Sequence, residues 1–311
     1  MKKVAIIGLS GNSLFYSLDN IPSVGETVKA KTYKKLVNVL NTMEKIMVEK
    51  RRTDDEILEA IDVACKRLGL DVYYLSAIGN DSYGKDCISF MEKEGINHKY
   101  VIKDVPTASA TILNDNESNN EVIVYHGANE KLSVDDVIGF EDVIRNVDCV
   151  LLNYEIPYDA LKKAVEISKK YNKLLIINPA PYIYDDLDLL READYVTPNE
   201  VELSQMYCQN INTFEDIENA YRDLMFKNLV VTLGSKGSYI CDDNGFRHIE
   251  AFKVNSVDST GAGDVYNAAF CYSILMGNSI DEACNFASLA SSKSVEKKFV
   301  MDAIPYIHEI K

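Results

Sequence analysis

Short apolar runs alternate with helical patterns through the second half of the chain. Five such runs follow residue 133, and helical periodicity separates most of them. Strands that alternate with helices in this way form a mostly parallel sheet with helices on both faces. The pattern therefore predicts an α/β fold with strands at 149–153, 174–178, 193–197, 229–233 and 238–242.

A β-branched run at 4–7 predicts a first buried strand that ends at Gly8. The polar loop G-L-S-G-N-S follows, and α/β folds bind ligands beyond strand ends of this kind. Asn12 and Ser13 are therefore candidate substrate contacts, although simple loop polarity explains them at least as well. The G-x-G-x-x-G fingerprint of dinucleotide-binding folds is absent, which argues against NAD.

The charge balance limits the partners. The 311 residues include 33 basic and 48 acidic ones, and the formal charge of −15 argues against nucleic acid or an anionic membrane surface. Seven cysteines are scattered without a C-x-x-C pair, mostly in apolar runs, as expected for reduced thiols in the core of a cytoplasmic protein. We expect neither a signal peptide nor a membrane span, because no apolar run is long enough.

The run D-S-T-G-A-G-D at 258–264 stands immediately before an apolar helical pattern. Helix N-termini bind anions through unpaired N–H groups and the helix dipole, and glycines let a phosphate approach the backbone. Asp264 beside such a site suits a general base that takes a proton from a hydroxyl attacking phosphate. An ordinary capped turn with a first-turn acid explains the same residues, so the run alone leaves both interpretations open.

This run resembles the C-terminal signature of the ribokinase/PfkB family of carbohydrate kinases. The resemblance implies a ribokinase-like fold, with a mostly parallel sheet, helices on both faces and a small β lid. It implies that Asp264 is the catalytic base and that the backbone of Gly261, Ala262 and Gly263 forms an anion hole for the transferred phosphoryl group. It also implies Asp258 as a ligand of a monovalent cation, potassium.

Four further segments resemble the family's motifs and occur in the family's order. The Glu in L-L-N-Y-E-I-P resembles the substrate-side glutamate, and N-P-A-P resembles a turn near the phosphates. T-P-N-E-V-E matches the N-x-x-E element that organises magnesium through water, and V-T-L-G resembles the turn that meets the triphosphate. These matches imply Glu155 for the substrate, Asn178, Asn199, Glu202, Thr232 and Gly234 for ATP, and Glu202 also for magnesium.

Two alternating β runs, A-S-A-T-I-L and E-V-I-V-Y, flank a polar turn and predict a hairpin. With strands near the N-terminus this hairpin resembles the family's lid, so we expect lid strands within about 12–33 and 100–125. No linker or repeat interrupts the chain, which predicts a single ribokinase-like domain over 1–311. The resemblance also implies a homodimer formed through the lid.

Residues 34–69 depart from the family, which carries a glycine-rich G-G-x-x-x-N motif after the lid strand. Apolar residues at helical spacing predict a helix over 36–47. A capping-box pattern at Thr53 and Glu56 predicts a second helix. The family's glycine positions would fall on 55–58, so we expect an atypical helical segment in place of the sugar-binding motif.

The ordered motifs predict an ATP-dependent kinase that uses Mg²⁺ and K⁺ and phosphorylates a hydroxyl of a sugar, sugar phosphate or nucleoside. The replaced segment favours an alternative, a catalytically impaired pseudokinase or a nucleotide-binding regulatory protein. A local change of reading frame is a third explanation of the segment and would leave a damaged kinase. The sequence does not select among sugars, because the residues that usually do so are those that differ.

Overall fold

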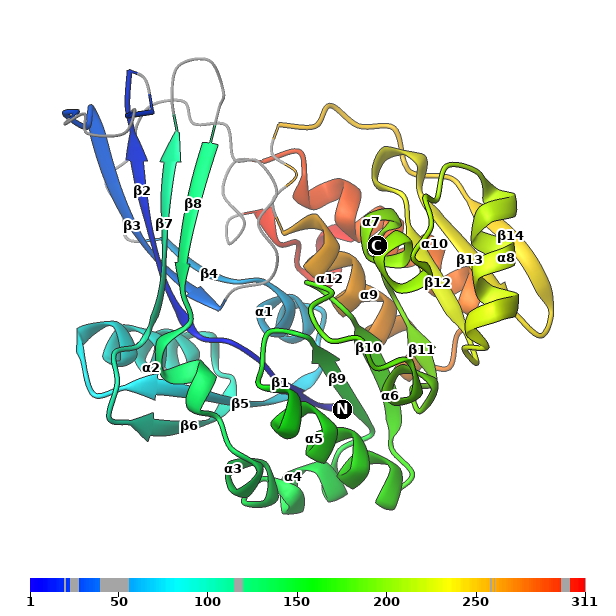
Figure 1. The fold of residues 1–311 in the computed structure, drawn as a ribbon, viewed down its shortest axis with the longest axis horizontal. Coiled ribbons are helices and arrows are strands. Elements are labelled where there is room, and N and C mark those ends of the chain that lie inside the picture. Colours follow the sequence, from blue (N-terminus) through cyan, green and yellow to red (C-terminus); the bar gives the residue numbers. More distant parts are fainter. Residues whose placement is uncertain are drawn as a thin grey trace.

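The central sheet of the molecule is mostly parallel. The structure, a computed structural model, describes residues 1–311 apart from 20, 23–27, 40–55, 115–119, 258, 260, 298–302 and 311. The strands of this sheet are β1 (Lys3–Ile7), β5 (Asp71–Gly79), β6 (Asn97–Lys103), β9 (Cys149–Asn153), β10 (Leu174–Asn178), β11 (Tyr195–Val196), β12 (Leu229–Thr232), β13 (Ser238–Asp242) and β14 (Gly245–Ile249). Their order is β14-β13-β12-β11-β10-β9-β1-β5-β6 (Figure 1), parallel from β12 to β6 and antiparallel on both sides of β13.

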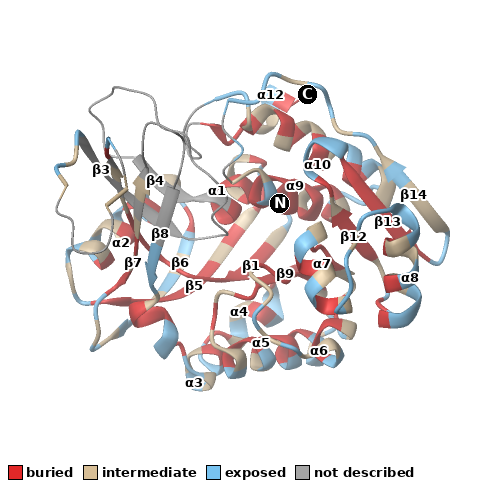
Figure 2. Cartoon of the chain, turned by 45° about the horizontal axis from the view of Figure 1, so that its top comes forward, coloured by how far each residue is buried: buried red, intermediate tan, exposed pale blue. Residues whose placement is uncertain are grey.

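Helices cover both faces of this sheet, because side chains along each strand alternate between two cores. Val4 and Ile6 of β1 belong to one core, and Ala5 and Ile7 belong to the other. The first core is covered by α1 (Ala60–Arg67), α2 (Ser82–Glu94), α9 (Ala262–Leu275) and α10 (Ile280–Ser294). The second is covered by α3 (Val134–Ile138), α4 (Glu141–Asn146), α5 (Tyr158–Lys170), α6 (Leu187–Arg191), α7 (Glu200–Tyr207) and α8 (Phe214–Leu224). Figure 2 shows the buried residues along the central strands and the helix faces toward them, which confirms the predicted α/β fold.

The predicted strands agree closely with the observed ones. The runs at 149–153, 174–178 and 238–242 coincide with β9, β10 and β13. The run at 193–197 is shorter in the structure, as β11, and the run at 229–233 ends one residue earlier, as β12. The remaining short elements are η1 (Gly127–Lys131), η2 (Gly234–Lys236) and α12 (Ile307–Ile310). Among the described helices, none has the length and apolar character needed to cross a bilayer.

A second sheet lies beside the central one (Figure 1). It contains β2 (Gly11–Ser17), β3 (Thr32–Val39), β4 (Glu56–Glu59), β7 (Ala108–Asn114) and β8 (Asn120–Tyr125), in the order β4-β3-β2-β7-β8. The two runs predicted as a hairpin are β7 and β8, which pair in antiparallel register with Thr111 opposite Ile123. Strand β2 joins the N-terminal strands of this sheet to the hairpin, because it pairs in antiparallel with β3 and in parallel with β7.

The prediction of a helical segment at 34–69 is wrong for residues 34–39 and 56–59, which form strands. Strand β3 extends to residue 39, beyond the range expected for the lid strands, and residues 56–59 form β4 parallel to it. The second helix therefore begins at Ala60, as α1. Hydrogen bonding of β3 to β2 along its length outweighs the helical spacing, as tertiary pairing commonly overrides local propensity. Residues 40–55 of the predicted segment lie outside the described residues.

Helix α1 carries a buried carboxylate in its first turn. Asp62 is 1% exposed, and neither oxygen has a hydrogen-bond partner within the described ranges. Burial raises the pKa of Asp62 from 3.8 to about 7, although the backbone N–H groups of Asp62 and Val63 act in the opposite direction. The unfolded chain loses this proton near its ordinary pKa, so the free energy of unfolding falls as the pH rises from about 4 to about 7.

We expect Asp62→Asn to remove this pH dependence. A pKa difference of about 3 units corresponds to about 4 kcal/mol, and the buried amide keeps part of the desolvation cost. The variant should therefore be more stable than the wild type by about 2 to 4 kcal/mol at pH 8 and nearly equal at pH 4, measured by urea denaturation. The matched control is Asp159→Asn, at an exposed first-turn acid of α5. An unchanged pH slope in Asp62→Asn would contradict the assignment.

Candidate active site

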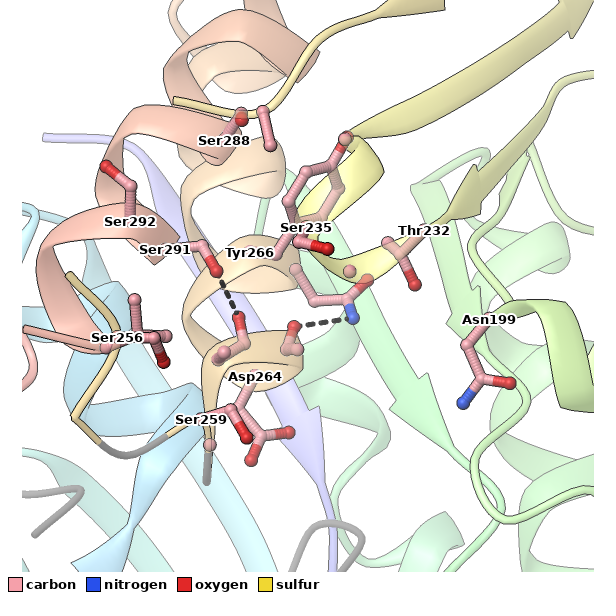
Figure 3. A pocket seen from close by; sticks show the side chains of 18 of the residues that line it. Asn199, Thr232, Ser235, Ser256, Ser259, Asp264, Tyr266, Ser288, Ser291 and Ser292 are labelled. Carbon is pink, nitrogen blue, oxygen red and sulfur yellow. Dashed lines mark hydrogen bonds between the residues drawn. The ribbon is translucent and has the colours of Figure 1, made fainter. Parts of the chain in front are cut away.

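A cavity of about 690 Å³ opens where α9 begins (Figure 3). Its walls come from the N-termini of α7 and α9, the end of β12 with η2, residues 251–254, 256 and 259, and one face of α10. The last residues of two parallel strands, Asn178 of β10 and Thr232 of β12, line it as well. The cavity thus lies at the carboxyl edge of the sheet, where α/β folds bind ligands.

The N-terminus of α9 faces this cavity, and its N-cap residue makes no side-chain hydrogen bond. The N-cap residue is Gly261, whose φ of 71° lies in the left-handed region that favours glycine. Its carbonyl oxygen accepts a hydrogen bond from the Val265 N–H at 3.0 Å, so the first turn is regular. Asp264 is 5% exposed and lies in that first turn, at the edge of the cavity. The arrangement combines an anion-binding helix end with a nearly buried carboxylate.

Two cavity-lining side chains hold the backbone of this first turn through hydrogen bonds. Ser291 Oγ donates a hydrogen bond to the Ala262 carbonyl oxygen at 2.9 Å, and Asn267 Nδ2 donates one to the Gly263 carbonyl oxygen at 2.9 Å (Figure 3). The hydroxyl of Thr197 donates to Asn267 Oδ1 at 2.6 Å, which fixes the orientation of the amide. The turn is therefore tied both to α10 and to the edge of the central sheet.

Asn178 joins the same set of hydrogen bonds. Its side chain is 7% exposed and donates from Nδ2 to the Thr197 carbonyl oxygen at 2.6 Å. It lines the cavity at the end of β10, as the N-P-A-P resemblance implies. Its amide links β10 to β11 and, through Thr197, supports the first turn of α9.

Asn199 and Glu202 form the capping box of α7. The Asn199 side chain accepts from the Glu202 N–H at 2.9 Å, and Glu202 Oε2 accepts from the Asn199 N–H at 2.8 Å. Glu202 is nevertheless a cavity-lining carboxylate, and it is 4% exposed. Within the described ranges, no group of three or more His, Cys, Asp or Glu residues forms a metal cage. One carboxylate fits Mg²⁺, which retains waters and binds substrate phosphates.

The turn after β12 completes the cavity opposite α10. Thr232 pairs with Asn199 in an isolated parallel bridge, and its N–H donates to the Pro198 carbonyl oxygen at 2.9 Å. Gly234 follows with a φ of 56°, a left-handed conformation that starts η2. Thr232 and Gly234 both line the cavity. Their backbone lies at the cavity wall because glycine makes the sharp turn there.

The predicted substrate residues lie elsewhere. Asn12 and Ser13 are fully buried on β2, which begins inside the predicted loop, and their side chains have no hydrogen-bond partner in the described part of the chain. Glu155 follows β9, and its carboxylate accepts from Asn153 Nδ2 at 2.9 Å. None of these three lines the cavity. Asp258, predicted as a cation ligand, lies outside the described residues.

The cavity therefore brings together nine of the predicted residues and adds others that sequence reasoning missed. The nine are Asn178, Asn199, Glu202, Thr232, Gly234, Gly261, Ala262, Gly263 and Asp264. Asn267 stands four residues after Gly263, a spacing at which a helical side chain reaches back to the preceding turn. Ser288, Ser291 and Ser292 recur at the spacing of one helix face, which was a usable signal for a polar wall.

Comparison with known proteins agrees with this geometry. Residues 61–306 match the family model described as pfkB family carbohydrate kinase. The chain is 32% identical over 254 residues to a ribokinase of Staphylococcus aureus, covering 80% of this chain and 84% of the relative. It is 28% identical over 312 residues to a deoxyribokinase of Salmonella typhi, covering 98% and 96%.

Solved structures show the same likeness. The ribokinase of Thermotoga maritima superimposes with a TM-score of 0.84 at 28% identity, over 100% of this chain and 98% of that one. The Arabidopsis thaliana ribokinase complexed with ribose and ATP superimposes with a TM-score of 0.84 at 26% identity, over the same shares. With the family match and the shared fold, the chain belongs to the pfkB family of carbohydrate kinases.

Proposed function

We propose that this chain is an ATP-dependent kinase that transfers the γ-phosphoryl group to a hydroxyl of a sugar, sugar phosphate or nucleoside. One observation carries the proposal: a nearly buried carboxylate, Asp264, shares one cavity with the N-terminus of α9, whose N-cap residue is a glycine. Phosphoryl transfer needs a proton acceptor and preorganised positive dipoles at the transferred group. The relatives' names, ribokinase and deoxyribokinase, support a pentose as the acceptor.

The geometry suits in-line transfer. Asp264 takes the proton of the attacking hydroxyl, while the first-turn N–H groups of α9 hold the oxygens of the transferred phosphoryl group. Glu202 would hold a magnesium ion through water, and the ion would offset charge on the phosphates. The role of Asp258 at a potassium site stays a prediction.

Buried polar groups support a sugar site at the second sheet. The side chains of Asn12 and Ser13 are buried without partners in the described ranges. Buried polar atoms are normally hydrogen-bonded, so a polyhydroxyl ligand or water suits this place. Glu155 adds a partly buried carboxylate after β9 that suits an acceptor of sugar hydroxyls.

The alternative function is a pseudokinase that binds nucleotide without phosphorylating a sugar. One observation favours it: β4 occupies residues 56–59, where the family's glycine-rich motif would fall. A paired strand with two glutamates does not offer the close backbone approach that glycines allow. Under this alternative the chain still binds nucleotide in the cavity, and only the binding of a phosphoryl acceptor is lost.

Asp264→Asn tests the kinase directly. We expect it to lower kcat at least 100-fold, because the amide cannot accept the proton, and to leave the KM for ATP within about threefold. The measurement is ATP consumption with a panel of pentoses, hexoses, hexose phosphates and nucleosides.

The matched control is Asp135→Asn, at an exposed first-turn acid of α3 remote from the cavity lining. Turnover equal to wild type in Asp264→Asn would remove the residue from its role. ATP binding in the wild type without turnover on any acceptor would support the pseudokinase.

Glu202→Gln separates the metal role of this residue from its capping role. The glutamine oxygen still accepts from the Asn199 N–H, so α7 should keep its cap. We expect the Mg²⁺ concentration for half-maximal activity to rise about tenfold, because a charged ligand is lost. Glu282→Gln, in the capping box of α10 with Ser279, is the matched control. Equal Mg²⁺ curves for both variants would refute the assignment.

We also propose a homodimer through the second sheet. Strand β8 lies at the edge of that sheet and exposes three large apolar side chains, Ile123, Val124 and Tyr125. Exposed apolar groups on an edge strand favour association with a second copy. Light scattering should give twice the mass of the chain, and Ile123→Lys should shift the protein to monomer. A wild-type monomer at all concentrations would exclude the dimer.

A further inference from the structure

Helix α10 contributes a hydroxyl to the backbone of the anion site. Ser291 Oγ donates to the Ala262 carbonyl oxygen at 2.9 Å, a hydrogen bond between side chain and backbone across the α9–α10 contact (Figure 3). A second hydrogen bond joins the segment before α9 to the end of α10, where the Val257 N–H donates to the Val295 carbonyl oxygen at 2.7 Å. The segment that leads into α9 and the first turn of α9 are therefore both anchored on α10.

The hydrogen bond from Ser291 is made to the carbonyl oxygen of the peptide that joins Ala262 and Gly263. The Ala262 carbonyl and the Gly263 N–H belong to one planar trans peptide, so they point in opposite directions. Fixing the carbonyl therefore fixes the N–H that opens toward the cavity. A donor on the carbonyl also polarises the peptide and strengthens its N–H as a donor.

Packing does not fix this peptide from the cavity side. Gly261 and Gly263 lack side chains, and a Cβ built on Gly263 would meet nothing within 4 Å. The next peptide is held in the same way, since Asn267 Nδ2 donates to the Gly263 carbonyl oxygen at 2.9 Å. Among the described residues, hydrogen bonds from the cavity-lining side chains of Ser291 and Asn267 thus help to set the orientation of both peptides.

Two other serines of α10 donate within their own helix instead. Ser292 Oγ donates to the Leu289 carbonyl oxygen and Ser294 Oγ donates to the Ser291 carbonyl oxygen, at 2.7 and 2.8 Å, both within their own helix. Ser294 is buried and does not line the cavity. It is therefore a matched comparison for Ser291, with the same chemistry on the same helix but no bond to α9.

We propose that Ser291 is a positioning residue of the phosphoryl-binding site. It orients the Ala262–Gly263 peptide so that the Gly263 N–H is aimed at the terminal phosphoryl group of the nucleotide. The inference rests on the proposed function, because the γ-phosphoryl group is the anion that this N–H would hold. It predicts an effect on ATP that is absent for ADP.

Ser291→Ala tests this role. We expect kcat/KM for ATP to fall about 3- to 10-fold, the range for one hydrogen bond, with the KM for the acceptor changed less than twofold. By titration calorimetry the Kd for ATP should rise by a similar factor, whereas the Kd for ADP should change less than twofold. Ser291→Thr keeps the hydroxyl and should restore most of the loss, and Ser294→Ala should behave as wild type.

Three results would overturn the proposal. The first is a Ser291→Ala variant whose Kd values for ATP and ADP both equal those of the wild type. The second is an equal loss of kcat/KM for ATP in Ser291→Ala and Ser294→Ala. The third is an equal rise of the Kd values for ATP and ADP in Ser291→Ala. The calorimetric readout needs no turnover, so it tests Ser291 even if no acceptor is phosphorylated. A protein that binds ATP with the expected Ser291 effect and never turns over would refute the kinase and retain the role of Ser291.

Discussion

The constraint on which the rest of the cavity depends is the orientation of the N-terminus of α9 toward it. Gly261, the N-cap residue, turns the chain with a left-handed φ of 71° and makes no side-chain hydrogen bond. Backbone N–H groups and the helix dipole then provide the positive potential. Asp264 is placed by the same turn, so its carboxylate and the helix end have a fixed relation. Asn267 of α9 itself and Ser291 of α10 hold this turn through hydrogen bonds.

That support comes from segments far apart in the sequence. Side-chain hydrogen bonds run from β10 to β11 and on to α9 through Asn178, Thr197 and Asn267, and α10 adds Ser291. The carboxyl ends of parallel strands meet at one edge, so short polar side chains there reach both the ligand and the helix. Catalytic preorganisation of this kind is built from neutral groups on rigid elements.

Much of the lining of the cavity was predictable from the sequence, whereas the strands at 32–39 and 56–59 were not. Local signals are strong where glycines, caps and short apolar strands coincide, as at the D-S-T-G-A-G-D run and at the capping box of Asn199 and Glu202. Strand β3 could not be predicted, because its pairing with β2 comes from distant sequence while its apolar spacing fits a helix. Asn267 and Ser291 were missed because a polar residue in an apolar helix has no fixed meaning until its partner is known.

The side chains that hold the first turn of α9 through hydrogen bonds are all uncharged. Serine, threonine and asparagine donors do not titrate between pH 5 and 9, and dipoles inside a cavity are screened little by salt. A chain of formal charge −15 thus holds a local region of positive potential that is independent of its overall acidity. The hydrogen bonds that hold the first turn of α9 therefore do not change with bulk pH in this range.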